Sequence, residues 1–144
     1  MSKFAVYRFI APFRSRLQDR LRKGRLHVTE ETFASQLKGR PDIAAALWET
    51  LREQAFVRDF RPEADEDLYK VFAMDPEIVR DELIEVLLAK LELNVSGIDF
   101  TGFDFASIKT PRDVSNFVAK VAKVQGDAIK RRMELRCQFT KYPN

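Results

Sequence analysis

One local pattern constrains the fold of this chain more than any other: the helix start Asp75-Pro76-Glu77 within residues 64–93. Aspartate is a preferred N-cap, because its carboxylate accepts a hydrogen bond from an unpaired backbone N–H of the first turn. Proline suits the first helical position, where its missing N–H costs nothing. Glu77 adds negative charge near the positive end of the helix dipole. The pattern predicts a helix that begins at Asp75.

The residues after this start have the apolar spacing of a core helix. The apolar positions recur every three or four residues, and they are Val79, Leu83, Ile84, Val86, Leu87, Leu88 and Leu91. The charged positions lie mostly on the other side, and they are Arg80, Asp81, Glu82, Glu85 and Lys90. We therefore expect a buried helix with one acidic face. An ordinary amphipathic helix whose charged face is solvated would show the same pattern.

Other segments also have helical periodicity. A basic helix follows Pro12 with Phe13, Leu17 and Leu21 every four residues, while residues 3–10 fit either an extended arm or its first turns. A second helix is predicted from the cap Thr29 to Gly39, with Val28 and Phe33 as a hydrophobic staple, and a third from about Asp42 to Ala55. Another helix is predicted to begin at the cap Thr110, and its buried positions are Val114, Phe117, Val118, Val121 and Val124. Trp48 is expected in the core. The fold class predicted is all-α, a compact bundle of about five to six helices.

Irregular segments are expected between these helices. Residues 57–62 and 94–97 lack periodicity, and residues 98–108 favour a loop pinned to the core by its phenylalanines over a lone strand. Gly126 is expected to interrupt the last helix before a basic segment over 127–137, followed by a loose tail.

Length and composition fit one helix-rich domain. The chain has 144 residues, 45% hydrophobic and 33% charged, with one cysteine and therefore no internal disulfide. No apolar run reaches the length of a membrane span, and Phe4 to Ala11 is too short for a signal peptide. A cytoplasmic protein is expected.

The charge is unevenly distributed, although the net charge is only +3. Residues 1–40 carry ten Lys/Arg against three Asp/Glu, residues 41–110 seven against sixteen, and residues 111–144 eight against three. The basic N-terminal helix has three possible roles: packing on the acidic part of its own domain, binding phosphates, or lying on an anionic membrane.

The central stretch resembles the loop and second helix of acyl carrier proteins. Leu68, Phe72 and Asp75 give the order apolar–x–x–x–apolar–x–x–Asp, and residues 91–95 resemble the end of that helix and the next loop. The resemblance spans about 43–125 and implies a carrier-like four-helix core, with a basic extension over 1–40 and a basic helix and tail over 127–144.

This sequence departs from the carrier pattern at the decisive residue. Acyl carrier proteins have Asp-Ser-Leu where this chain has Asp75-Pro76-Glu77, so the serine that bears phosphopantetheine is replaced by Pro76, which has no hydroxyl. The resemblance therefore implies a carrier-shaped domain without its prosthetic group, and we expect no cofactor.

No catalytic pattern is found in the sequence. His27 is the only histidine, which excludes a multi-histidine metal site, and nothing local supports a His27–Cys137 dyad. The acidic cluster at 63–67 lacks the glycine and distal glutamate of a calcium loop, so a solvated loop, a first helical turn or a docking patch remain. We expect neither a metal site nor an enzyme.

Two functions remain open. The first is a protein-interaction module in which the acidic helix face steers a basic partner and exposed apolar groups anchor it; its residues are Met74, Asp75, Glu77, Ile78, Asp81 and Glu82. The alternative is a nucleic-acid-binding protein that contacts phosphates with Arg14, Arg16, Arg20, Arg22, Lys23, Arg25, Lys130, Arg131 and Arg132.

Overall fold

Helices form all the regular structure in the computed structural model, which describes residues 3–93 and 100–140. Side chains at 3–11, 128–130, 132 and 135–140 lie outside that description, as does the predicted turn at 94–97. No β-strand occurs in the described residues, so the predicted all-α class is confirmed. The elements are α1 (Lys3–Gly24), α2 (Glu30–Leu37), α3 (Pro41–Gln54), α4 (Leu68–Phe72), α5 (Pro76–Ile78), η1 (Val79–Ile84), α6 (Glu85–Lys90), η2 (Phe105–Ser107) and α7 (Pro111–Thr140).

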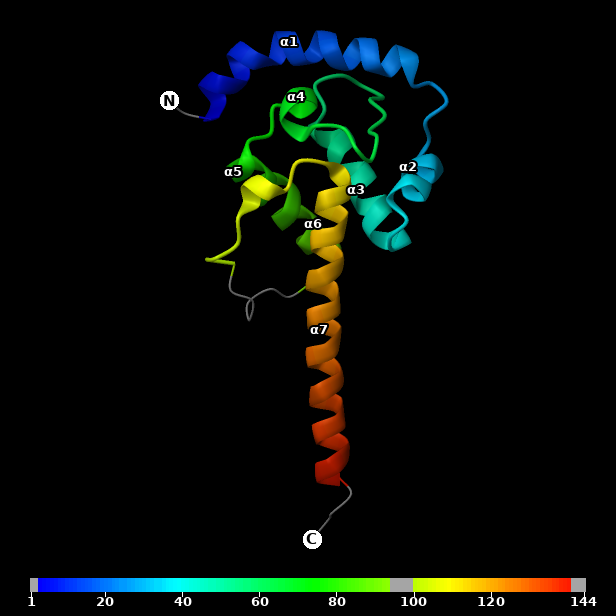
Figure 1. Ribbon diagram of the computed structural model, residues 1–144, viewed down its shortest axis with the longest axis vertical. Coiled ribbons are helices and arrows are strands. Elements are labelled where there is room, and N and C mark those ends of the chain that lie inside the picture. Colours follow the sequence, from blue (N-terminus) through cyan, green and yellow to red (C-terminus); the bar gives the residue numbers. More distant parts are fainter. Residues whose placement is uncertain (1–2, 94–99, 141–144) are drawn as a thin grey trace.

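Two long helices give the molecule its shape. Figure 1 shows α1 lying across one end of the body, next to α4, while α7 begins within the body and its second half extends away from the other helices. At 1.5 Å per residue, the thirty residues of α7 span about 45 Å. The start of α1 and the last turns of α7 therefore occupy opposite ends of the molecule.

The core lies where α3 meets α2, α6 and the first half of α7. Its largest fully buried side chains include Phe33, Phe60 and Phe72, and the rings of Phe60 and Phe72 meet edge to face with centroids 5.4 Å apart. Trp48 is buried and its ring lies 5.4 Å from that of Phe33, which confirms its predicted place in the core.

The predicted helix starts are confirmed in atomic detail. Thr29 and Thr32 form a reciprocal capping box, and Val28 and Phe33 are both buried beside it. The Asp75 carboxylate accepts a hydrogen bond from the N–H of Ile78 at 2.8 Å. Thr110 and Asp113 cap α7 in the same reciprocal manner. Each cap satisfies backbone donors that the first helical turn leaves unpaired.

The helix that begins at Asp75 contains a feature absent from the prediction. Over Val79–Ile84 it widens into a π-helix, in which the N–H of Glu85 donates to the carbonyl of Arg80, five residues back. The apolar stripe is nevertheless buried as predicted at Val79, Leu83 and Leu87. No single residue type demands this widening, so the sequence pattern contains no signal for it.

Four local predictions need correction or completion. Residues 3–10 belong to α1, so the open choice there resolves to helix. Lys38, not Gly39, takes the left-handed conformation that ends α2. Gly126 does not interrupt α7, because an exposed glycine costs only about 1 kcal/mol in a long helix. Val124 is 57% exposed rather than buried, because α7 has left the body by that point.

A buried ion pair joins Arg25, the first residue after α1, to the irregular connection between α3 and α4. The Arg25 guanidinium lies 2.7 Å from a Glu66 carboxylate oxygen, donates to the Arg61 carbonyl at 3.1 Å, and stacks over the Phe60 ring. Seven residues earlier on α1, the buried Gln18 amide donates to the Val71 carbonyl and accepts from the Phe56 N–H, each at 2.8 Å. These contacts attach one face of α1 to the body.

Removing one partner of this ion pair should destabilise the protein strongly. We expect Arg25→Met to lower the free energy of unfolding by about 3 kcal/mol, because it leaves the Glu66 carboxylate buried and unpaired. The double variant Arg25→Met/Glu66→Met should recover most of that loss. Urea unfolding followed by the fluorescence of Trp48, the only tryptophan, measures both values.

The matched control is Lys23→Met, two residues away, because Lys23 is exposed and its pair with Asp19 is expected to contribute about 0–1 kcal/mol. Equal losses for Arg25→Met and Lys23→Met would contradict a structural role for the Arg25–Glu66 pair.

Candidate functional site

The predicted partner site begins at an exposed helix start. Asp75, Pro76 and Glu77 are all solvent-exposed at the beginning of α5. A small hollow of about 240 Å³ lies beside them, lined by Tyr69, Met74 and Lys109 among others. Asp81 and Glu82 follow on η1 and are half-buried. The acidic residues of the prediction therefore follow one another along one continuous stretch of helix, at positions that are exposed or half-buried.

The apolar anchors of that prediction are not available. Met74 and Ile78 are only 4% and 7% exposed, so the expectation that they are exposed is wrong. The physical reason is the turn before the helix. Ala73 takes a left-handed conformation with φ of 58°, and the N–H of Met74 donates to the Leu68 carbonyl at 3.2 Å. This turn directs the chain inward, and Met74 and Ile78 join the core.

The acidic cluster at 63–67 is largely committed to contacts within the protein. Glu66 pairs with Arg25, and both oxygens of Asp65 accept hydrogen bonds from Arg112 on α7 at 2.7 and 3.0 Å. Asp67 is the N-cap of α4, where it accepts from the Lys70 N–H at 2.9 Å. This result favours structural roles over the docking patch left open by the sequence.

The basic residues of α1, together with Arg25 directly after it, divide into two groups. Arg25 is buried, and Arg22 is half-buried, pairs with Asp19 and donates to the Arg58 carbonyl at 3.2 Å. Arg14 is half-buried with its guanidinium over the Tyr69 ring. The exposed group is Arg16, Arg20 and Lys23. The predicted phosphate-binding set is thus reduced to three exposed cations on α1.

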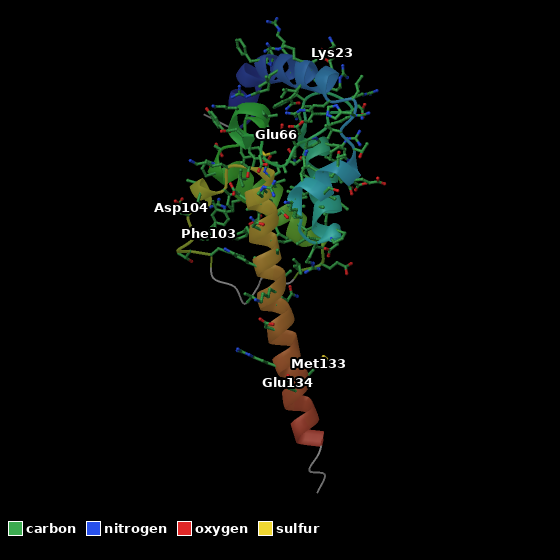
Figure 2. All side chains as sticks on the ribbon, turned by 45° about the vertical axis from the view of Figure 1, so that its right-hand side comes forward. Lys23, Glu66, Phe103, Asp104, Met133 and Glu134 are labelled. Atoms are coloured by element: carbon green, nitrogen blue, oxygen red, sulfur yellow. The ribbon has the colours of Figure 1, made fainter. Side chains whose placement is uncertain are left out.

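The other predicted cations lie far from α1. Arg131 is exposed on the projecting half of α7, while the side chains of Lys130 and Arg132 lie outside the described residues. Figure 2 shows the same separation, with Lys23 on α1 at one end and Met133 and Glu134 on α7 towards the other. The described members of this set of nine basic residues therefore do not form one continuous surface.

The described part of the chain contains no arrangement of side chains that is typical of a catalytic site. His27 is exposed at the end of α1, whereas Cys137, whose side chain lies outside the description, is on the far half of α7. Among the described residues, no three His, Cys, Asp or Glu side chains gather closely enough to bind a metal ion. None of the described helices combines the length and the apolar character that crossing a membrane requires.

An aromatic groove at the base of α7 is the feature that the sequence analysis missed. It has a volume of about 500 Å³ and is lined by Phe100, Phe103, Ser107, Ile108, Asp113, Asn116, Phe117, Lys120, Val121 and Val124. Its wall is the segment 100–108, which the sequence analysis predicted to be a loop held by its phenylalanines, and this prediction is confirmed from residue 100 onward.

Three phenylalanines, Phe100, Phe103 and Phe117, line this groove, and the ring of Phe105 packs against them. The rings of Phe103 and Phe117 have centroids 4.7 Å apart, and those of Phe103 and Phe105 are 4.9 Å apart. Asp104 holds the turn, since its carboxylate accepts from the Ala106 N–H at 3.0 Å. Figure 2 shows Phe103 and Asp104 together at the side of the body. Phe103 remains 40% exposed and Val124 57% exposed.

The sequence contains the residues that form the groove, but their pattern alone predicts a loop anchored to the core and a fully buried helix face. The run Phe100 to Phe105 contains three phenylalanines in six residues, and two of them, Phe100 and Phe103, line the groove. Val124 was assigned to the buried face of α7, when it is in fact the outer edge of the groove.

Comparison with known proteins gives no match for this chain, whether with protein-family models, curated proteins or solved structures. Any functional assignment therefore depends on the geometry of the molecule itself.

The acidic cluster generates a pH prediction with a defined sign. Burial raises the pKa of Glu66 despite the opposing effect of Arg25, so the folded protein holds this proton more tightly than the unfolded chain. The contribution of Glu66 to stability should be largest below its ordinary pKa and fall as pH rises through the window above that value. The difference in free energy of unfolding between wild type and Glu66→Gln, measured across this window, should decrease accordingly.

Asp65→Asn provides a control of opposite sign. The hydrogen bond from Arg112 lowers the pKa of Asp65, so its contribution is present above the ordinary value and is lost as pH falls. Slopes of the same sign for both variants would contradict this account of the cluster.

Proposed function

We propose that this chain is a non-catalytic protein-interaction module that binds an acidic amphipathic helix of a partner protein. The contact surface in this proposal is the aromatic groove at the base of α7, in place of the predicted Asp75 helix face. The observation that carries the proposal is the exposed apolar lining of the groove, with Phe103 and Val124 both well exposed to solvent. Exposed apolar surface bordered by polar residues is typical of interaction sites.

The helical character of the partner follows from the shape of α7. Its second half leaves the body, and a helix of about fifteen residues that packs against nothing is marginal in water. The groove residues Phe117, Val121 and Val124 lie one turn apart. In the sequence Ala128 follows one turn later, and Leu135 and Phe139 lie on the same side after a turn that carries Arg131 and Arg132. A second helix packed along α7 would bury such a stripe.

The acidic character of the partner follows from charge. Residues 120–136 carry six Lys/Arg and two Asp/Glu, and exposed Lys120 lies at the groove itself. A second copy of α7 would bring two basic helices together, and like charges across an interface cost affinity. An acidic helix instead complements the field of α7 and gains in association rate.

The first prediction from this proposal concerns peptide binding. Three synthetic helical peptides with the same leucine pattern, and with Glu, Gln or Lys at the polar positions, should bind in that order of decreasing affinity. Val124→Asp should weaken binding of the Glu peptide about tenfold, since burial of one valine is lost. Fluorescence anisotropy of labelled peptides gives the affinities.

Met133→Asp is the matched control, because Met133 is also exposed on α7, at 62%, but does not line the groove. Sedimentation velocity on the same proteins tests whether a second copy of this chain occupies the groove instead. Equal effects of the two substitutions, preference for the Lys peptide, or a dimer abolished by Val124→Asp would each overturn the proposal.

The carrier-like core remains part of the proposal. Pro76 is exposed at the first position of α5, where the carrier pattern has its modified serine, and it offers no hydroxyl for attachment. We therefore expect the intact mass of the chain, after expression together with a phosphopantetheinyl transferase, to equal the mass of the unmodified sequence. Mass spectrometry checks this, and an added phosphopantetheine would contradict a carrier-like domain without its prosthetic group.

A further inference from the structure

A second surface, at the opposite end of the molecule from the projecting half of α7, is the outer face of α1. Phe13, Arg16, Arg20 and Lys23 are separated by three, four and three residues, so they lie along one side of the helix. All four are exposed, Phe13 to 70%. Gln18 and Arg25, seven residues apart, are buried against the body and mark the opposite side.

We propose that this outer face of α1 binds the surface of an anionic lipid membrane, with the helix lying in the plane of the interface. Helices that bind in this way combine Lys and Arg with aromatic or leucine residues, and they bind more tightly to anionic lipids. Here, three cations form a row, with exposed Phe13 at one end and Leu26, 66% exposed in the turn after the helix, at the other.

The cations of this row are available to a ligand. The structure gives Arg16 and Arg20 no ion pair with any described residue, and the only pair of Lys23 is with Asp19 at 3.2 Å on the helix surface. The cations that do serve the fold, Arg22 and Arg25, point to the Arg58 and Arg61 carbonyls. Lipid binding would therefore require no contact of the body to break.

The first part of α1 favours lipid over nucleic acid. Residues 3–11 belong to the helix, and seven of these nine are apolar, with Lys3 and Arg8 as the only charges. Binding to nucleic-acid phosphates needs cations rather than exposed phenylalanine and leucine, and the exposed cations Lys120, Lys123 and Arg131 lie on α7, the helix that runs away from α1. A helix that lies in a membrane interface uses both cationic and apolar side chains.

The arrangement of the helices permits this orientation. Figure 1 shows α1 across one end of the body with α7 running away from it, so a flat surface against α1 meets neither α7 nor the aromatic groove. The surface is independent of the proposed function, because none of its residues lines the groove.

Flotation with vesicles tests the inference. The full chain should bind vesicles of equimolar phosphatidylcholine and phosphatidylglycerol, and should not bind phosphatidylcholine alone. Each cation near an anionic surface contributes about a fivefold gain in affinity, so Arg16→Glu/Arg20→Glu should weaken binding at least about 30-fold. Lys123→Glu/Arg131→Glu on α7 changes the net charge equally at two exposed positions outside the groove and should have little effect.

A fluorescence measurement distinguishes insertion from loose electrostatic attraction. In a Phe13→Trp variant, tryptophan emission should shift to shorter wavelength on adding the anionic vesicles, while buried Trp48 in the wild type should not shift. Equal losses for the two double variants, no shift at position 13, or tight salt-dependent binding of duplex DNA or single-stranded RNA without vesicle binding would each overturn the inference.

Discussion

The fold depends on how the backbone N–H and carbonyl groups of the connection between α3 and α4 find hydrogen-bond partners. Residues 55–67 contain no regular helix, yet Phe60 and Ala64 within them are buried in the core. Buried backbone groups need partners, and here they come from side chains of α1 and α2. Gln18 accepts from the Phe56 N–H, Gln36 accepts from the Ala64 N–H, and Arg25 donates to the Arg61 carbonyl. The basic helix is therefore part of the fold rather than an appendage.

This constraint determines how much of α1 is available for function. The helix is attached through Gln18 and Arg25 on one side, and the ion pair of Arg25 with Glu66 withdraws two charges from the surface. Counting charges along the chain cannot distinguish cations that hold the fold from cations that face solvent. The structure separates them by position on the helix, with Arg22 and Arg25 on the attached side and Arg16 and Arg20 on the free side.

Local signals predicted the fold well because each depends on neighbouring residues. The caps at Thr29, Asp75 and Thr110 and the apolar stripe after Asp75 are decided within one or two helical turns. The errors concern long-range geometry. Burial of Met74 depends on the left-handed turn at Ala73, and exposure of Val124 depends on where α7 leaves the body. Helical periodicity gives the apolar face of a helix but not how far along the helix that face is covered.

The same limit explains why the aromatic groove was missed while its components were noticed. Phenylalanines at 100, 103 and 105 form a loop anchored to α7, as expected, yet anchoring uses only part of their surface. Because α7 continues through Gly126 instead of ending there, Val124 lies beside these rings on a helix that extends beyond the core. The uninterrupted helix leaves an apolar groove open at the side of the body, near the point where α7 leaves it, while α1 presents cations at one end of the molecule.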